Sequence, residues 1–180
     1  MKSVLWSIKK EHLDNIKNGY KLDEIRKKIP SDLHIDTVNY LYETKSSGGS
    51  GKIIGECKFN NKTYIYADII DGTKHLYNTA FIKPCISNER LFDYLYDSTK
   101  KDGWALRISD LVIYDKPREL SDFATFCKGT GSATDKTCKN CRYLCFDNDP
   151  INGYTRFCGA NKRKTLIRPP QSWCYVEELR

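Results

Sequence analysis

The sequence predicts an α+β domain in which strands outnumber helices, joined to a small lobe that a metal ion stabilises. Runs in which apolar and polar residues alternate recur through residues 4–114 and are separated by turn residues, which is typical of strands. Two segments instead space their apolar residues three or four apart, as amphipathic helices do. From residue 127, five cysteines gather in a stretch with few aliphatic residues, which therefore needs a covalent or metal staple to fold.

The first elements bring charged residues of both signs together. The apolar run at residues 4–8 predicts a strand, and Leu13 and Ile16 predict a short helix after it. Gly19 ends this helix, because a helix C-terminus commonly needs a residue that tolerates positive φ. Residues 22–28 follow in an extended pattern, so Glu24 and Arg26 are expected on one face of a strand.

Later elements follow the same logic. Ser87 is the expected N-cap of a second helix, whose buried stripe consists of Leu91, Tyr94 and Leu95. The Ser- and Gly-rich residues 46–51 predict a mobile loop at the mouth of a site. Lys116–Leu120 should break the last long strand and lead into a short helical turn near residue 126. The expected strands are residues 37–44, 52–59, 63–70, 103–114 and a final strand within 165–180.

The composition indicates a globular, basic protein and argues against a membrane-spanning one. The chain has 180 residues, of which 39% are hydrophobic and 12% aromatic, as in a globular protein. Its formal charge is +7, with basic residues in excess at both ends, which favours a polyanionic partner. No apolar run approaches the roughly 20 residues that span a bilayer, and charges interrupt the N-terminus too early for a signal peptide. We therefore expect a cytoplasmic protein without a membrane partner, whose clustered cysteines bind metal.

The order of these parts resembles the ASCH domain of the PUA-like superfamily. The resemblance covers about residues 2–120 and the last strand. It rests on five segments: Ser-Val-Leu-Trp-Ser-Ile-Lys at 3–9, Ile-Lys-Asn-Gly at 16–19, Gly-x-Lys-x-x-Glu-x-Arg at 19–26, Val-Asn-Tyr-Leu-Tyr-Glu-Thr at 38–44 and Lys-Ile-Ile-Gly-Glu-Cys at 52–57. It implies a small closed β-barrel with short flanking helices and a cleft that accepts RNA, DNA or a single nucleobase. The expected domains are then an ASCH/PUA-like barrel (1–126), a cysteine-rich zinc lobe (127–164) and a final strand that returns to the barrel (165–180).

Cysteine spacing in the lobe predicts a structural zinc site. Cys138-x-x-Cys141 has the spacing of a metal knuckle, and Cys127 and Cys158 flank it as the other two expected ligands. Cys145 is the alternative ligand. A catalytic zinc usually has histidine or carboxylate ligands and an open position, but no histidine follows residue 75. The predicted role of zinc is therefore to hold the shape of the lobe.

The leading functional hypothesis is a nucleic-acid-binding module that reads RNA or a modified or flipped base. In this hypothesis Lys21 and Arg26 contact phosphate or a base edge, while Glu24 accepts from an exocyclic amine or orients Arg26. Lys9 adds positive charge beside them. Tyr42 is the expected stacking residue, with Trp6 and Tyr20 as other candidates.

Two alternatives stay open. The first is a hydrolase, either a ribonuclease or an amidohydrolase acting on a modified nucleoside. The resemblance includes a branch of amidohydrolases that uses a lysine, a threonine and a glutamate, and Lys21 matches the lysine. The threonine position, however, holds Glu24, so the nucleophilic hydroxyl is missing. The second alternative is a zinc-stabilised protein-interaction domain. Further carboxylates (Glu43, Glu56, Asp68) are available to a site, and the histidines (His12, His34, His75) are expected at the surface.

Overall fold

A computed structural model describes residues 3–97, 100–125, 147–149, 153–155 and 164–178. The chain divides into two compact units. The first consists of Met1–Arg118 with Pro169–Cys174, and the second of Glu119–Arg168 with Tyr175–Arg180. All five clustered cysteines of the predicted zinc site (Cys127, Cys138, Cys141, Cys145 and Cys158) lie outside the described residues.

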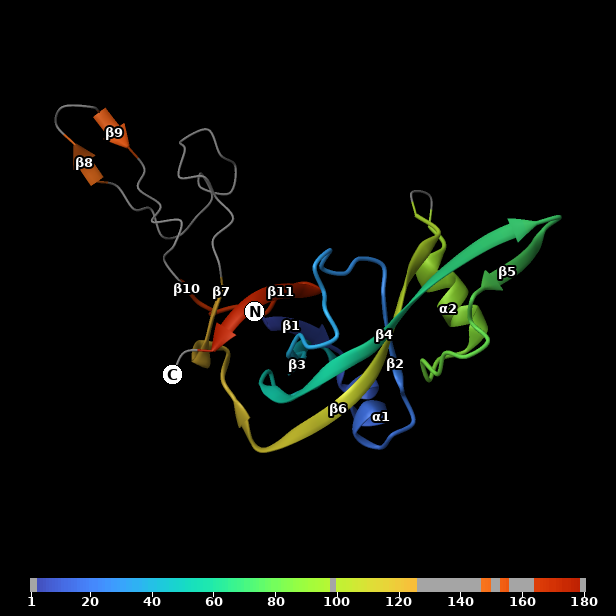
Figure 1. Cartoon of the computed structure of the whole chain (residues 1–180), viewed down its shortest axis with the longest axis horizontal. Coiled ribbons are helices and arrows are strands. Elements are labelled where there is room, and N and C mark those ends of the chain that lie inside the picture. Colours follow the sequence, from blue (N-terminus) through green and yellow to red (C-terminus); the bar gives the residue numbers. More distant parts are fainter. Residues whose placement is uncertain (1–2, 98–99, 126–146, 150–152, 156–163, 179–180) are drawn as a thin grey trace. The chain divides into compact units, whose positions relative to one another are not determined.

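The first unit contains both α-helices of the described chain and six strands (Figure 1). In chain order its elements are β1 (Ser3–Ile8), α1 (Lys10–Lys17), β2 (Asp23–Arg26), β3 (Asn39–Glu43), the 3₁₀ turn η1 (Lys45–Ser47), β4 (Ile53–Ile70), β5 (Thr73–Tyr77), α2 (Asn88–Leu95) and β6 (Asp102–Arg118). In the second unit, β7 (Phe123–Thr125) pairs antiparallel with β10 (Lys164–Thr165) and with β11 (Trp173–Glu178), which begins in the first unit. The 3₁₀ turn η2 (Leu120–Asp122) precedes β7, and β8 (Asp147–Asp149) and β9 (Gly153–Thr155) form a separate hairpin.

The sheet of the first unit is not a closed barrel. Its strand order is β1-β3-β4-β6-β2, with β5 attached to β4, and among the described strands β2 pairs only with β6. Strand β1 runs parallel to β3, while the β3–β4, β4–β6, β6–β2 and β4–β5 pairs are antiparallel. The expected closed barrel was therefore wrong. Closure would need backbone hydrogen bonds between β2 and β1. Instead, the Arg26 side chain on β2 donates from Nη2 to the Ser7 carbonyl oxygen on β1 at 2.8 Å.

Strand β4 corrects a second expectation. The two strands expected at residues 52–59 and 63–70 form one continuous strand, Ile53–Ile70, paired along most of its length with β6. The register between β4 and β6 shifts at three places, as β-bulges do, and bulges let long strands bend. Asp71 and Gly72, both at positive φ, make the two-residue turn into β5. Strand β6 likewise runs through Pro117 to Arg118 instead of ending before it.

The core lies on both faces of this sheet. On one face, Trp6 is fully buried, meets Phe59 edge-on at 5.5 Å between ring centroids, and donates from Nε1 to Asn39 Oδ1. On the other, helix α2 packs against Ile65, Ala67 and Ala105 through a stripe of Leu91, Phe92 and Leu95. The expected Ser87 cap is confirmed, since its Oγ accepts from the Arg90 N–H at 3.3 Å. Phe92 takes the buried position expected for Tyr94, which is 43% exposed.

Candidate nucleic-acid interface

The largest concentration of buried charge in the described chain lies on β2 and the segment before it. Helix α1 ends in a Schellman motif, in which Gly19 N–H donates to Ile16 O and Tyr20 N–H donates to Asn15 O. Gly19 has φ +72°, as the sequence predicts. This turn reverses the chain so that Lys21 and β2 return past the helix, with Lys21, Glu24 and Arg26 all at most 9% exposed.

These three side chains form one ion-pair network. Glu24 Oε1 lies 2.9 Å from Arg26 Nε, and Glu24 Oε2 lies 3.3 Å from Lys21 Nζ. The strand alternation therefore placed Glu24 and Arg26 correctly on one face. Burial alone would raise the pKa of Glu24, but the charges of Arg26 and Lys21 outweigh it and hold the pKa below its ordinary value. Glu24 is therefore a carboxylate at neutral pH.

One oxygen of Glu24 is satisfied only in part. Lys21 Nζ donates to the Pro84 carbonyl oxygen at 3.2 Å and lies 3.3 Å from Glu24 Oε2, an ion pair that is poorly aligned for a hydrogen bond, and no other described residue donates to this oxygen. Arg26 Nε likewise makes no hydrogen bond with the described residues. It lies close to Glu24 Oε1, but its N–H group is poorly aligned with that oxygen. A buried acceptor without a donor costs free energy, so a ligand N–H or O–H group at this place would stabilise the site.

Arg26 joins three parts of the first unit. Besides its contact with Glu24, it donates from Nη2 to Ser7 O on β1 and from Nη1 to Ser172 Oγ at 3.3 Å. Its guanidinium also lies over the Trp6 ring, 5.4 Å from the centroid. The guanidinium therefore holds β1, β2 and the returning C-terminal segment in place, which leaves less of it for a phosphate than the sequence suggested.

The network opens onto a cleft of about 340 Å³. Strand β1 ends on one side of the cleft and β2 lies on the other, with the first turn of α1, the Thr44–Ser46 segment and Tyr94 completing its walls. The cleft therefore occupies the place where a closed barrel would have joined β1 to β2. Its charged lining consists of Lys9, Lys21, Glu24 and Arg26, three cations against one anion, so its net charge is positive. Its polar lining also includes Ser7 and His12.

Comparison with solved structures identifies this arrangement of strands and helices. The ASCH protein of Zymomonas mobilis matches with a TM-score of 0.55 at 17% sequence identity, over 98% of this chain and 88% of that chain. A single-substitution variant of the same protein, ZmASCH, matches with a TM-score of 0.56 at 16% identity, over 98% of this chain and 91% of that one. The chain has the ASCH fold. Neither a protein-family profile nor a curated protein sequence matches it.

Two lining residues of this ASCH fold were missed by sequence reasoning. His12 lies in the first turn of α1, one turn before the buried Ile16, and its side chain is 27% exposed. Burial and the neighbouring Lys21 charge lower the pKa of His12, so its imidazole is neutral at pH 7. Tyr94 is the aromatic residue that lines the cleft, with Lys27 Nζ 5.6 Å from its ring centroid. The four-residue spacing between His12 and Ile16 could have predicted that His12 lies on the same face of α1 as the buried Ile16.

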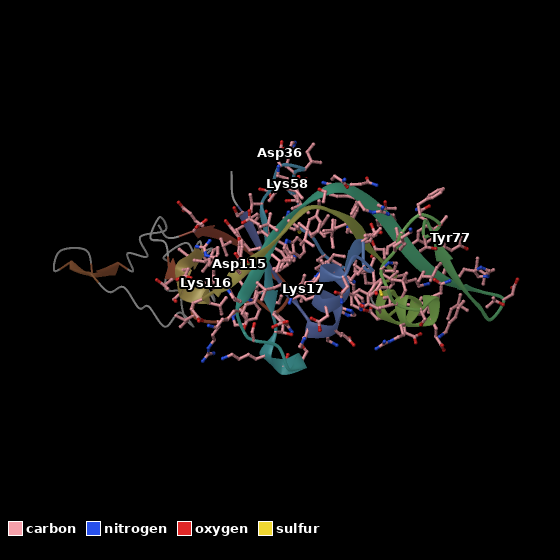
Figure 2. The ribbon with its side chains drawn as sticks, turned by 90° about the horizontal axis from the view of Figure 1, so that it is seen from below. Lys17, Asp36, Lys58, Tyr77, Asp115 and Lys116 are labelled. Carbon is pink, nitrogen blue, oxygen red and sulfur yellow. The ribbon has the colours of Figure 1, made fainter. Side chains whose placement is uncertain are left out.

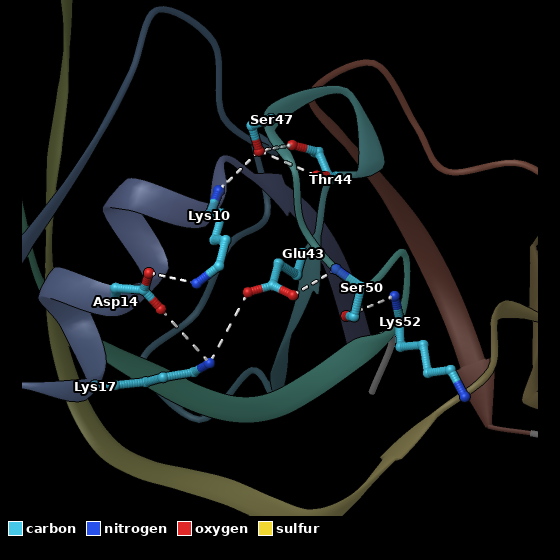
Figure 3. Close-up of polar contacts among 8 residues, drawn as sticks. All are labelled: Lys10, Asp14, Lys17, Glu43, Thr44, Ser47, Ser50 and Lys52. Carbon is cyan, nitrogen blue, oxygen red and sulfur yellow. Dashed lines mark hydrogen bonds and ion pairs between the residues drawn. The ribbon is translucent and has the colours of Figure 1, made fainter.

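Residues 44–51 turn around the Glu43 carboxylate (Figure 3), and Thr44 and Ser46 of this segment line the cleft. Glu43 is 5% exposed, and its Oε2 accepts the Ser50 N–H at 2.6 Å. Burial would raise the pKa of Glu43, but the Ser50 hydrogen bonds and the Lys17 charge hold it below the ordinary value. Ser47 Oγ accepts the Lys10 N–H at 2.9 Å and donates to Thr44 O, which ties the segment to the start of α1. The loop expected to be mobile is thus wrapped around a buried carboxylate.

The other predicted cleft residues lie at different depths. Lys9 is exposed at the cleft rim and precedes α1. Tyr42 is 3% exposed on β3 and does not line the cleft, and Trp6 is fully buried in the core. Tyr20 is 69% exposed and lies outside the cleft lining. Tyr94 is therefore the tyrosine that lines the cleft beside the ion-pair network.

The remaining acids and histidines are placed elsewhere. Glu56 accepts from the Tyr114 hydroxyl, and Asp68 pairs with Lys101 at 2.9 Å. His34 and His75 do not line the cleft. Within the described residues, no three His, Cys, Asp or Glu side chains group as metal ligands would. Neither helix of this part of the chain is long and apolar enough to cross a bilayer.

Proposed function

We propose that this ASCH-fold chain is a nucleic-acid-binding module that takes one base of RNA, or a modified or flipped base, into the cleft between β1 and β2. The observation that carries the proposal is the buried Glu24 carboxylate, whose Oε2 is held by the Lys21 ion pair and has no well-aligned hydrogen bond from the described residues, in a cleft of net positive charge. A nucleotide offers both a hydrogen-bond donor for Glu24 and a negative charge for the surrounding cations. An amino group or ring N–H of the base donates to Glu24, while the phosphate backbone is attracted by the surrounding cations.

Size and shape support a single base as the ligand. A volume of about 340 Å³ lies at the lower end of the range for small-molecule sites, roughly 300–1,000 Å³, and leaves no room for a duplex. A base must then be single-stranded or flipped out of its helix to enter. Tyr94 offers a ring for stacking, and Lys9 at the rim is placed to meet a phosphate.

The test is binding of labelled single-stranded RNA and DNA by fluorescence anisotropy. Glu24→Gln keeps the shape of the side chain but turns one acceptor into a donor. We expect it to weaken binding by about 1.5–3 kcal/mol, the value of a hydrogen bond to a charged group. Glu89→Gln is the matched control, because Glu89 is exposed on α2 and outside the cleft. Affinity should also fall as salt rises, since phosphate contacts release counterions. Equal affinities for parent and Glu24→Gln would refute the proposal.

A hydrolase acting in the same cleft is the second candidate, and His12 is the observation that favours it. A neutral imidazole is the form that accepts a proton, whereas the lowered pKa of Glu24 makes that carboxylate a weak base. A turnover assay on RNA and on acylated nucleosides separates the two functions. Turnover by the parent that His12→Gln abolishes, with ligand affinity intact, would establish the hydrolase and make binding its first step.

Cysteine spacing further supports a structural zinc ion in residues 127–158, held by Cys127, Cys138, Cys141 and Cys158, with Cys145 as the alternative ligand. We expect about one equivalent of zinc in protein purified without added metal. The double variant Cys138→Ser, Cys141→Ser should lose that zinc and melt at lower temperature, because a structural zinc contributes directly to folding. Cys85→Ser is the control, since Cys85 lies outside the cluster. Unchanged metal content in the double variant would contradict the zinc assignment.

A further inference from the structure

Four aromatic side chains form a continuous row across three strands of the first unit. The Trp104 ring on β6 meets Tyr64 on β4 at 5.3 Å between centroids. Tyr64 lies 6.2 Å from Tyr66, and Tyr66 stacks on Tyr77 of β5 at 4.4 Å with the rings nearly parallel, 7° apart. Figure 2 shows Tyr77 on the β4–β5 hairpin, well away from Lys17 on α1. We call these four residues the aromatic row.

The row is directed to solvent by strand alternation. Ile65 and Ala67, the neighbours of the tyrosines on β4, are at most 1% exposed and pack into the core with α2. Tyr64 and Tyr66 point to the opposite face and are 43% and 36% exposed. Cross-strand aromatic pairs do stabilise sheets, but pairs directly opposite each other account for only Trp104–Tyr64 and Tyr66–Tyr77. The contact between Tyr64 and Tyr66 joins the two pairs into one surface.

The row begins beside the cleft. In the β2–β6 pair Arg26 lies directly opposite Trp104, and in the β4–β6 pair Trp104 lies directly opposite Tyr64. Directly opposite residues share a face of the sheet, so Arg26, Trp104 and Tyr64 follow one another across β2, β6 and β4 on the same face. A chain leaving the cleft past Arg26 would therefore meet the aromatic row next.

Charge around the row suits a polyanion. Lys62 lies two residues before Tyr64, hence on the same face of β4. Its Nζ donates to the Leu33 carbonyl oxygen and forms no ion pair with a carboxylate of the described residues. The two carboxylates beside the tyrosines are each paired with a lysine: Asp102 with Lys100 at 3.4 Å, and Asp68 with Lys101 at 2.9 Å. The overall formal charge of +7 and this pairing of the nearby carboxylates favour the approach of phosphates.

We propose that the aromatic row is a stacking track for the nucleotides that flank the base held in the cleft. The ligand is then a single-stranded nucleic acid several nucleotides long, and not a free nucleoside. Ring faces bind successive bases without regard to sequence, because every base has a π-face, while the cleft reads one base. This inference rests on the proposed function and adds the length and strandedness of its ligand.

The experiment compares a mononucleotide with single strands of two, four and eight nucleotides. For the parent we expect affinity to rise with length. The double variant Tyr64→Leu, Tyr66→Leu should weaken binding of the eight-nucleotide strand by about five- to 150-fold for each stacked base that it loses, and leave mononucleotide binding unchanged. Tyr64→Phe and Tyr66→Phe keep the rings and should bind like the parent. Tyr20→Leu is the control for an exposed ring outside the row. Circular dichroism and melting temperature show whether each variant folds. If the double variant does not fold, the single variants Tyr64→Leu and Tyr66→Leu replace it in the binding assay.

The outcomes separate this inference from the proposed function. Affinity that is independent of length, or binding of the long strand that survives both Leu substitutions, overturns the stacking track even if Glu24→Gln weakens binding. Loss of binding in the Phe variants overturns it as well, because ring faces would then not be the contact. Absence of binding to any strand, with or without the row, instead refutes the proposed function. Quenching of tryptophan fluorescence by the long strand, lost in Trp104→Phe, would place a base on the row itself.

Discussion

Two glutamates in the first unit, Glu24 and Glu43, are both buried, but different contacts hold their carboxylates. Each is at most 5% exposed, and the pKa of each lies below its ordinary value. Glu43 reaches this state through hydrogen bonds from the Ser50 segment, with Lys17 Nζ more distant at 3.9 Å. Glu24 reaches it through the charges of Lys21 and Arg26, and one of its oxygens accepts no hydrogen bond in the described chain.

The difference separates a structural carboxylate from one poised to bind. A carboxylate that accepts a backbone N–H fixes the path of the chain, and its geometry is complete without a ligand. A carboxylate held mainly by ion pairs that are poorly aligned for hydrogen bonds can still accept one from a ligand, which offsets part of the cost of its burial. Under the proposed function the two glutamates have separate roles: Glu43 shapes the segment that carries the lining residues Thr44 and Ser46, and Glu24 meets the ligand.

The largest expected effect comes from removing each carboxylate. Glu24→Ala leaves Lys21 and Arg26 buried without a counter-charge, which should destabilise the fold by about 3–5 kcal/mol. Glu43→Ala leaves one backbone N–H without its acceptor, and we expect a smaller loss of about 1–3 kcal/mol. Urea unfolding followed by tryptophan fluorescence measures both. Equal losses would mean that the two sites are held in the same way.

A smaller effect is expected from the glycines that let the wall fold around Glu43. A Cβ at Gly49 would lie 2.5 Å from Glu43 Cγ and 2.7 Å from Thr44 O, too close for either to stay in place. Gly49→Ala should therefore cost about 1–3 kcal/mol, as overpacking does, and weaken ligand binding by displacing the wall. Gly48→Ala is the control, because it meets nothing within 4 Å and bears only the cost of its φ of +78°, about 1 kcal/mol. A Gly48 variant as unstable as the Gly49 variant would show that backbone strain, and not Glu43, shapes the loop.

The sequence was a good guide wherever one residue pattern decides a local structure. Gly19 at positive φ, the buried Leu13 and Ile16 of α1, and the Ser87 cap of α2 were all predicted, because each depends only on neighbours in the chain. The pairing of Glu24 with Arg26 also followed from strand alternation.

Features that depend on distant contacts were not predicted. The strands expected at 52–59 and 63–70 left a break at residues 60–62, but Asn61 and Lys62 pair with β6 and keep β4 continuous. Barrel closure failed because it depends on whether β2 pairs with β1, which no local pattern encodes. His12 and Tyr94 were missed because their place in the cleft depends on how each helix packs on the sheet.

The smallest effect is the pH dependence of stability. A carboxylate whose pKa is lower in the folded protein contributes stability that is fully present above its unfolded value and is lost as the pH falls through the folded value. For Glu24 and Glu43 the unfolded value is about 4.5, so stability should begin to fall near that pH and continue to fall below it. Glu43→Gln should flatten this acid limb without altering binding at neutral pH, whereas Glu24→Gln should flatten it and weaken binding. Urea midpoints and anisotropy from pH 7 to pH 3 measure both quantities for the same variants. If Glu43→Gln weakens binding as strongly as Glu24→Gln does, the division between a wall-forming and a ligand-binding carboxylate is wrong.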